Sequence, residues 1–266
     1  MVDASIQQSI NVADLFSVKG KIALVTGGSR GIGLMIARAY AVNGVKVYIS
    51  SRKKEACNNA AAELSKIGEC VSIPADLSTS EGRAALVSEI KRREHKLHIL
   101  VNNAGASWGA TIEAYPEEAW DKVMTINVKS IFMLTRDLLD VLARAGTAED
   151  PARVINVGSI DGIKVPALDN FAYSPSKAAV HHLTRVLAVR IASHNMTVNA
   201  VAPGPFESKM TEWMLKNFRE TVEQICPRKR IGRPSDMAGV ALFLASPAGA
   251  FINGAVIPVD GGLSLT

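Results

Sequence analysis

Short β-branched runs alternate with longer helical stretches along this chain, and this alternation limits the fold more than any other feature. Seven strands are predicted, at residues 22–25, 45–49, 71–73, 99–101, 154–157, 198–201 and 256–259. Helical periodicity separates them, at 34–43, 56–67, 83–93, 120–143 and 178–192. Strand–helix–strand connections of this kind place successive strands parallel. We therefore predict an α/β fold, a doubly wound parallel sheet of about seven strands with helices on both faces.

Length and composition fit one domain of this type. The chain has 266 residues, of which 48% are hydrophobic and only 5% aromatic, so the core must consist of Val, Ile, Leu and Ala. No repeat or Pro/Gly-rich linker interrupts the series. We expect a short N-terminal tail at 1–20 and a single domain at 21–266. The only long stretch between predicted strands, 203–244, is interpreted as an insertion whose apolar part forms a substrate lid around 204–226.

Charge and cysteine content bear on location and partners. Thirty basic and 25 acidic residues give a formal charge of +5, with the basic residues scattered. That distribution argues against nucleic-acid binding, which needs a concentrated basic stripe, and fits an anionic cofactor or substrate. Cys57, Cys70 and Cys226 have no metal-like spacing and are expected to be reduced thiols, with no metal site. Neither a signal-like segment nor a membrane-spanning run is recognisable, so a cytoplasmic protein is expected.

A glycine-rich turn follows the first predicted strand directly. Residues 26–33 read Thr-Gly-Gly-Ser-Arg-Gly-Ile-Gly, and a helical pattern begins at once. Glycines let the backbone approach a pyrophosphate, whose charge is met by the N-terminus of the next helix. The alternative, a purely structural tight turn, is disfavoured by the position between strand and helix. The predicted dinucleotide contacts are Gly27, Ser29, Arg30, Gly31, Ile32 and Gly33.

The end of the second predicted strand bears on the choice of cofactor. Proteins of this fold that bind NAD carry an acidic residue there, which accepts from the adenosine ribose. This chain instead has Ser50-Ser51-Arg52-Lys53-Lys54. Arg52 can clamp a 2′-phosphate, and Arg30 can approach the same phosphate from the other side. We predict NADPH, bound by Ser51 and Arg52; the alternative is that 52–54 are only a solvated helix start.

Several ordered motifs resemble the classical short-chain dehydrogenase/reductase family, from about Lys21 to Gly262. They are the turn at 26–33, Asp76-Leu77, Asn102-Asn103-Ala104-Gly105, Asn127, Ser159, Tyr173 with Lys177, and Pro203-Gly204. This resemblance implies a Rossmann-type fold and a pyridine-nucleotide oxidoreductase. It also implies that Asp76 and Leu77 flank the adenine. Asn103, Ala104 and Gly105 would run beneath the cofactor, and Pro203, Gly204 and Phe206 would border the nicotinamide.

Tyr173 and Lys177 are spaced i, i+4, which places both on one face of a helix. A nearby ammonium is expected to lower the pKa of the phenol, so that Tyr173 exchanges a proton with a carbonyl oxygen as hydride is transferred. Ser159 follows the fifth predicted strand and can hold the same oxygen. An isolated Tyr-x-x-x-Lys pair is usually an exposed helix surface, but Ser159 and the nucleotide turn favour a catalytic pair. By resemblance, Lys177 also bonds the nicotinamide ribose and Asn127 anchors a water that links Lys177 to solvent.

Resemblance to family members also implies a homotetramer or homodimer built on the two helices at 120–143 and around Tyr173. Their apolar positions are Ile131, Leu134, Leu138, Val180, Leu183 and Leu187. Periodicity does not separate an interface from burial within one chain. His181 and His182 point about 100° apart on a helix and are interpreted as packing or interface residues rather than a metal or acid–base pair.

Longer stretches, such as 73–78, 107–110, 151–156 and 173–177, resemble the β-ketoacyl reductase branch associated with rhamnolipid synthesis. The branch implies NADPH-dependent reduction of a 3-oxoacyl thioester. Basic residues Arg228, Lys229, Arg230 and Arg233 would then face an acyl carrier protein or coenzyme A, or are simply solvated. Two alternatives stay open: an NADP(H)-dependent enzyme for another ketone or alcohol (a polyol, steroid or aromatic ketone), and a non-catalytic dinucleotide-binding protein.

Overall fold

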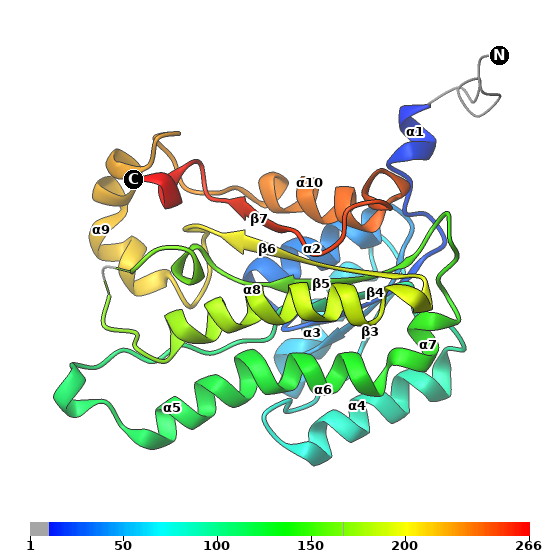
Figure 1. Cartoon of the computed structure of the whole chain (residues 1–266), viewed down its shortest axis with the longest axis horizontal. Helices are drawn as coiled ribbons and strands as arrows, with labels where there is room; N and C mark the ends of the chain where they lie inside the picture. The colour runs from blue at the N-terminus through cyan, green and yellow to red at the C-terminus, as the bar shows by residue number, and fades with distance from the viewer. Residues whose placement is uncertain (1–10, 167) are drawn as a thin grey trace.

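The computed structural model describes residues 11–166 and 168–266. The predicted N-terminal tail therefore lies partly outside the described residues, and its described part contains one short helix, α1 (Val12–Leu15). The described chain forms one layered α/β domain with a single seven-stranded sheet at its centre (Figure 1).

All seven strands are parallel, and they occupy the predicted positions. They are β1 (Ile22–Thr26), β2 (Lys46–Ser50), β3 (Cys70–Ser72), β4 (Ile99–Asn102), β5 (Ala152–Val157), β6 (Met196–Pro203) and β7 (Val256–Val259). Their order is β3-β2-β1-β4-β5-β6-β7. The order reverses between β1 and β4, and in an open parallel sheet the ligand crevice lies at the carboxyl ends beside such a switch. The predicted doubly wound sheet is confirmed.

Helices cover both faces of the sheet, as predicted. On one face α2 (Gly31–Val42), α3 (Lys54–Leu64) and α10 (Pro234–Ala245) pack on a core that includes Val25, Ile49 and Val101. On the other face lie α4 (Ser80–Arg93), α6 (Ser130–Asp137), α7 (Leu139–Ala143) and α8 (Tyr173–Arg190), with a core that includes Leu24, Tyr48 and Leu100. Alternating strand residues thus feed opposite cores, because successive side chains of a strand point to opposite faces.

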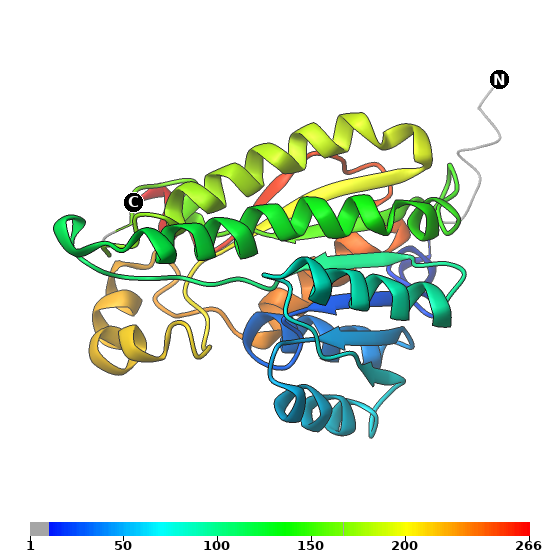
Figure 2. The ribbon, with the colours of Figure 1, turned by 90° about the horizontal axis from the view of Figure 1, so that it is seen from below.

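The long central helix predicted at 120–143 is divided. It begins as α5 (Glu117–Met124), passes through a π-helical turn at Thr125–Lys129, and continues as α6 and α7. Single π turns insert one extra residue per turn and are frequent at functional sites. Here the turn contains Asn127. Figure 2 shows α5 and α6 lying side by side with α8, and α8 contacts both α5 and the π turn.

The interpretation of 203–244 as one insertion is wrong for its last part. The segment contains α9 (Glu212–Ile225), which belongs to the expected lid, but it also contains α10. Met237, Ala241 and Leu244 of α10 are buried against α2 and the sheet, so α10 is a crossover helix of the fold. Its apolar residues cover most of the helix circumference, which hides the amphipathic period used in prediction. Among the described residues, no helix is long and apolar enough to cross a membrane.

Candidate active site

The glycine-rich turn adopts the conformation that its sequence predicts. Gly27 and Gly31 have positive φ angles of 66° and 53°, which favour glycine. Gly33, in the first turn of α2, packs against the glycine-rich turn. A Cβ at Gly33 would lie 2.4 Å from the Gly27 carbonyl oxygen. No side chain caps α2, and its first turn holds no acidic residue. The free N–H groups and the positive end of the helix dipole are therefore available to a phosphate.

The Asn103–Gly105 segment is fastened to this turn. The Thr26 hydroxyl accepts hydrogen bonds from the backbone N–H groups of Asn103 (2.9 Å) and Ala104 (3.0 Å). The Asn103 amide nitrogen donates to the Thr26 carbonyl oxygen at 2.8 Å. The carboxyl ends of β1 and β4 thereby form one rigid floor, which is the place that the resemblance predicts for the cofactor. Thr26 is a site-building residue that the sequence reasoning did not single out.

Two arginines at this edge fit a 2′-phosphate. Arg30 and Arg52 are exposed, and neither forms an ion pair with a carboxylate in the described part of the chain. The hydroxyls of Ser50 and Ser51 at the end of β2 are buried with no hydrogen-bond partner among the described residues. Asp76 is committed elsewhere: its carboxylate accepts from the backbone N–H and hydroxyl of Ser78. These donors suit a phosphorylated ribose better than a free 2′-hydroxyl.

Asp76 and Leu77 have separate local roles. Burial alone would raise the pKa of the Asp76 carboxyl, but the Ser78 hydrogen bonds and the charge of Arg52 hold it below its ordinary value. The Leu77 side chain is buried in the core, and its carbonyl oxygen accepts from Arg83 at 2.8 Å. If Leu77 contacts the adenine as predicted, the contact has to come from its backbone, because its side chain is buried.

Ser159, Tyr173 and Lys177 meet at the carboxyl ends of β5 and β4. Ser159 begins the turn after β5, and α8 begins at Tyr173, so both reactive residues occupy its first two turns. The Lys177 ammonium lies 5.5 Å from the centre of the Tyr173 ring and donates to the Val157 carbonyl oxygen at 2.7 Å. Lys177 and Ser159 are buried and Tyr173 is half-buried. The structure thus brings the predicted trio together.

Burial dominates the charge states of this pair. It raises the pKa of Tyr173 to about 12, although a hydrogen bond with Ser159 opposes the rise. It also lowers the pKa of Lys177 to about 8, against the charge of Asp161. The pKa of the phenol is therefore raised in this structure and not lowered as expected, because desolvation of the phenolate dominates. A phenol of this kind is fully protonated at neutral pH, so it carries the proton that reduction of a carbonyl consumes.

Asn127 holds the cofactor floor to the catalytic helix. Its Oδ1 accepts from the Ala106 N–H at 2.8 Å, and its Nδ2 donates to the Ala106 carbonyl oxygen and to the Ser176 hydroxyl, each at 2.9 Å. A Cβ at Gly105 would lie 3.1 Å from Asn127 Oδ1 and 3.8 Å from the Lys177 ammonium. Asn127 is thus close to Lys177. Ser176, one residue before Lys177, completes the link and was not predicted.

The residues expected beside the nicotinamide divide into two groups. Pro203 ends β6, and Gly204 approaches the backbone of Asp260 so closely that a Cβ would lie 2.9 Å from the Asp260 Cα. Phe206 is 2% exposed and packs in the core, where its ring contacts Gly232. Its side chain is therefore part of the core and not an exposed apolar group of the expected lid. The aromatic side chains of the lid that remain exposed are Trp213 and Phe218, whose ring centres are 5.7 Å apart.

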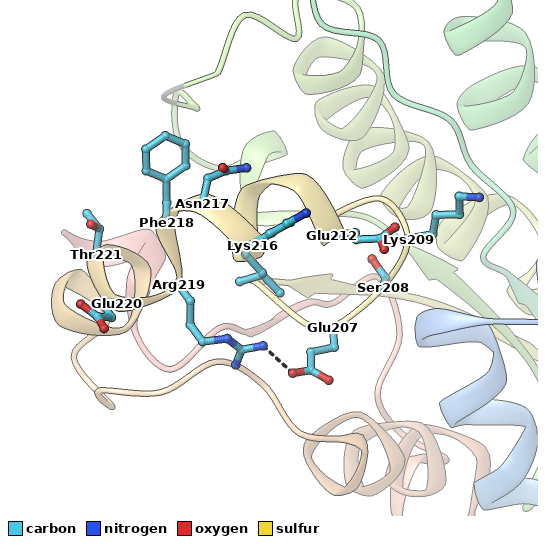
Figure 3. A pocket seen from close by; sticks show the side chains of 11 residues that line it. Glu207, Ser208, Lys209, Glu212, Lys216, Asn217, Phe218, Arg219, Glu220 and Thr221 are labelled. Carbon is cyan, nitrogen blue, oxygen red and sulfur yellow. Dashed lines mark hydrogen bonds and ion pairs between the residues drawn. The ribbon is translucent and has the colours of Figure 1, made fainter.

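A cavity of about 890 Å³ opens beside α9 (Figure 3). Glu207 and Arg219 form an ion pair at 2.5 Å across it, and Ser208 lies at its edge. A Cβ at Gly31 would lie 3.1 Å from the Ser208 Cβ, so the lid segment reaches the phosphate turn. None of the catalytic residues lines this cavity. We interpret it as space behind the lid, because the reactive side chains lie at the strand ends instead.

The structure shows which apolar positions of these two helices are buried within the chain. Ile131, Leu134, Leu138, Val180 and Leu187 are buried within the chain, and Leu183 is partly buried. His181 is buried and His182 exposed, so the packing interpretation holds for His181. The large apolar side chains that these helices leave exposed are Trp120, Phe132, Val186 and Val189.

Comparison with known proteins defines the class. A family model described as enoyl-(acyl carrier protein) reductase matches residues 27–264. The chain belongs to the short-chain dehydrogenase/reductase family, and it is an oxidoreductase of that family. The resemblance seen in its motifs is confirmed.

Particular relatives share nearly the full length of the chain. A rhamnolipids biosynthesis 3-oxoacyl-[acyl-carrier-protein] reductase from Pseudomonas aeruginosa is 48% identical over 252 residues, which are 94% of this chain and 98% of the relative. The solved Pseudomonas aeruginosa RhlG/NADP active-site complex has a TM-score of 0.92 and 47% identity, over 94% of this chain and 99% of that chain. Galactitol 2-dehydrogenase (L-tagatose-forming) from Cereibacter sphaeroides is 37% identical over 94% of this chain and 98% of its own length.

Proposed function

We propose that this protein reduces the ketone of a 3-oxoacyl thioester to a secondary alcohol, with NADPH as the hydride donor. The observation that carries the proposal is the convergence of Ser159, Tyr173 and Lys177 on the strand edge that also bears the glycine-rich turn, where Arg30 and Arg52 have no carboxylate partner among the described residues. The reductase relative and the NADP complex described above support both the substrate class and the cofactor.

The chemistry divides between the cofactor and the chain. Bound NADPH supplies a hydride to the carbonyl carbon. The Ser159 hydroxyl holds the carbonyl oxygen, and Tyr173 donates its proton to that oxygen as negative charge develops there. Lys177 stabilises the resulting phenolate and delivers a proton back to it. The net result is addition of one hydride and one proton to the C=O bond.

An apolar substrate is supported by the side chains around this edge. Exposed apolar residues come from the loop after β4 (Trp108, Ile112), from the loop before α8 (Ile163, Val165, Leu168, Phe171) and from the lid (Met210, Trp213, Phe218). The two loops are joined, since the Ala110 N–H donates to the Asp169 carbonyl oxygen at 3.1 Å and Tyr115 packs edge-on against Phe171. Large exposed apolar groups that cluster in this way mark a site for an apolar ligand.

The test is the initial rate of NADPH oxidation on acetoacetyl-coenzyme A, a longer 3-oxoacyl thioester, an enoyl thioester and unrelated ketones, with NADH in parallel. We expect turnover of the 3-oxoacyl thioesters with NADPH. Activity only on other ketones would discard the thioester assignment, and fast NAD-dependent oxidation of galactitol would favour the polyol alternative.

Tyr173→Phe removes the proton donor while keeping the ring. We expect at least a hundredfold loss of kcat, and undiminished activity would refute its role.

Three finer features complete the proposal. The acyl group is carried by acyl carrier protein or coenzyme A, whose acidic groups meet Arg228 and Arg233, because Arg230 is already paired with Asp236. The protein is a homodimer or homotetramer joined through the exposed face of α6 and α8 at Phe132, Val186 and Val189. Its location is cytoplasmic, which suits three free, buried cysteines. The KM values for substrates carried on acyl carrier protein and on coenzyme A test the first feature. Light scattering of Val189→Arg tests the oligomeric state, and cell fractionation tests the location.

A further inference from the structure

The loop that follows β4 rests against the start of the catalytic helix, and Tyr115 makes hydrogen bonds to both. Tyr115 lies at the end of that loop, two residues before α5. Its hydroxyl accepts from the Ala172 N–H at 3.3 Å and donates to the Trp108 carbonyl oxygen at 3.4 Å. A hydroxyl can do both, because it is a donor and an acceptor at once. Tyr115 therefore joins the loop after β4 to the loop before α8 through backbone groups of each.

The half-buried ring of Tyr115 stands between two further aromatic side chains. The Phe171 ring, from the loop before α8, has its centre 5.8 Å away at an interplanar angle of 82°. The Trp120 ring, from α5, has its centre 6.5 Å away at 79°. Both pairs are edge-to-face, which is a preferred arrangement of aromatic rings. The ring is thus fixed from two sides, and this holds its hydroxyl against Ala172.

The backbone group that Tyr115 binds lies directly before the proton donor. Ala172 is fully buried, and it precedes Tyr173, the first residue of α8. The next two N–H groups, those of Tyr173 and Ser174, donate to the Asn170 carbonyl oxygen at 2.8 and 3.3 Å. The first N–H groups of a helix need acceptors from outside it. Tyr115 supplies the acceptor for Ala172, so the place of the first turn of α8 depends on this hydroxyl.

We propose that Tyr115 is a positioning residue for the reduction, whose hydroxyl sets the place of the Tyr173 phenol and ties the apolar loop at Trp108 to that place. The inference rests on the proposed role of Tyr173 as proton donor. Proton donation requires hydrogen-bond distance between the phenol and the carbonyl oxygen, so a small shift of the first turn of α8 slows this step more than it weakens binding. Trp108 is exposed. An apolar substrate that packs on it therefore packs on the loop that holds the proton donor in place.

The test compares Tyr115→Phe with Tyr40→Phe in the full chain. Tyr115→Phe keeps the ring, and with it both edge-to-face contacts, and removes only the hydroxyl. Tyr40 is the matched control, because its hydroxyl also bonds to a backbone group, the Ala241 carbonyl oxygen at 3.1 Å, but between α2 and α10 on the other face of the sheet. The readouts are kcat, the KM for substrate and for NADPH, the solvent deuterium isotope effect on kcat, and Tm. The substrate is acetoacetyl-coenzyme A or, if the wild type does not reduce it, the ketone that the wild type reduces fastest.

We expect Tyr115→Phe to lower kcat about tenfold, because small misplacements of a reacting group are costly, and to change the KM for NADPH by less than about twofold. The solvent isotope effect on kcat should rise, since proton donation becomes slower; a loss of packing alone would not raise it. Tyr40→Phe should lower Tm and leave kcat and the isotope effect unchanged.

Three results would overturn the inference: an unchanged kcat in Tyr115→Phe, a loss confined to the KM for substrate, or an equal loss of kcat in Tyr40→Phe. Failure of the proposed function gives a different pattern. If only other ketones are reduced, the thioester assignment fails and the comparison of the two variants still decides the role of Tyr115. If Tyr173→Phe keeps full activity, the proton donor is wrongly assigned, and the inference falls with it.

Discussion

At the scale of single residues, the charge of Lys177 decides how this site responds to pH. Burial lowers its pKa to about 8, so the ammonium is the main form below that pH and the neutral amine above it. Besides the Ser159 hydrogen bond, the ammonium is the group that stabilises the phenolate left by proton donation. We therefore expect kcat/KM for reduction to fall as pH rises through about 8. A profile that stays flat to pH 9.5, measured in buffers of constant ionic strength, would contradict this role.

The cofactor preference is also a residue-scale property. Arg52 lies at the end of β2 with no carboxylate partner among the described residues. A guanidinium on a phosphate contributes charge-assisted hydrogen bonds, each worth roughly 1.5–3 kcal/mol. We expect Arg52→Ala to raise the KM for NADPH by at least tenfold and to change the KM for NADH little. Arg38→Ala removes another exposed arginine, from the middle of α2, and is the matched control. Equal effects on the two cofactors would contradict the 2′-phosphate contact.

At the scale of elements, His181 sets the packing of α8 against the turn that carries Ser159. A Cβ at Gly158 would lie 2.2 Å from His181 Nε2, and one at Gly162 would lie 2.8 Å from its Cε1. The imidazole thus fills the notch between the two glycines that flank the Ser159 turn. Its Nε2 is buried without a hydrogen-bond partner among the described residues. The His181 side chain, which is distant in sequence, therefore requires small residues at positions 158 and 162.

This packing makes stability depend on pH. Burial, aided by the charge of Lys177, lowers the pKa of His181 to about 4. The unfolded chain takes up a proton below about 6.5 while the folded chain does not, so stability is lost as pH falls from 6.5 towards 4. We expect the free energy of unfolding to drop by about 2 kcal/mol between pH 7 and pH 5 from this group. In urea melts, His181→Asn should remove that part of the drop, whereas the exposed His182→Asn should keep it.

At the scale of the whole molecule, a buried cluster at the opposite end of the strands joins distant parts of the chain. Arg153, 1% exposed on β5, donates to the carbonyl oxygens of Leu244 and Ser246, each at 3.1 Å, and to Asp150 at 2.9 Å. Lys21 adds bonds to Asp150 (2.7 Å) and to the Ala245 carbonyl oxygen (3.0 Å). These cations satisfy the last carbonyls of α10, which have no partner within the helix.

Removal of Arg153 should therefore destabilise the entire fold. Arg153→Met removes the donor to the Leu244 and Ser246 carbonyl oxygens and leaves Asp150 paired with Lys21 alone, and we expect a loss of about 3 kcal/mol and a lower Tm. Arg92→Met removes an arginine whose ion pair with Glu89 is exposed on α4, so its cost should be much smaller. Comparable losses in the free energy of unfolding for the two variants in urea melts would show that the buried cluster stabilises the fold no more than an exposed ion pair does.

The architecture was predictable because its signals are local. The β-branched runs appear as β1 to β7 nearly residue for residue, since buried parallel strands need such residues over four to eight positions. By contrast, α10 was absorbed into a supposed insertion because it is apolar on nearly every side. The start of α8 was placed too late, since Pro175 in its first turn reads as a break although proline is tolerated there.

Within the site, the sequence by itself determined the glycine turn, the Tyr173–Lys177 pair and the absence of an acid beside Arg52. Each of these depends on residues a few positions apart, whose spacing is set by the helix or turn that they form. Only the tertiary structure decided that Asp161 faces Asn170, that His181 fits two glycines, and that Phe206 turns into the core. It also decided that burial outweighs the Ser159 hydrogen bond in setting the pKa of Tyr173. Contacts between distant segments and the desolvation that they cause appear only when the chain is folded.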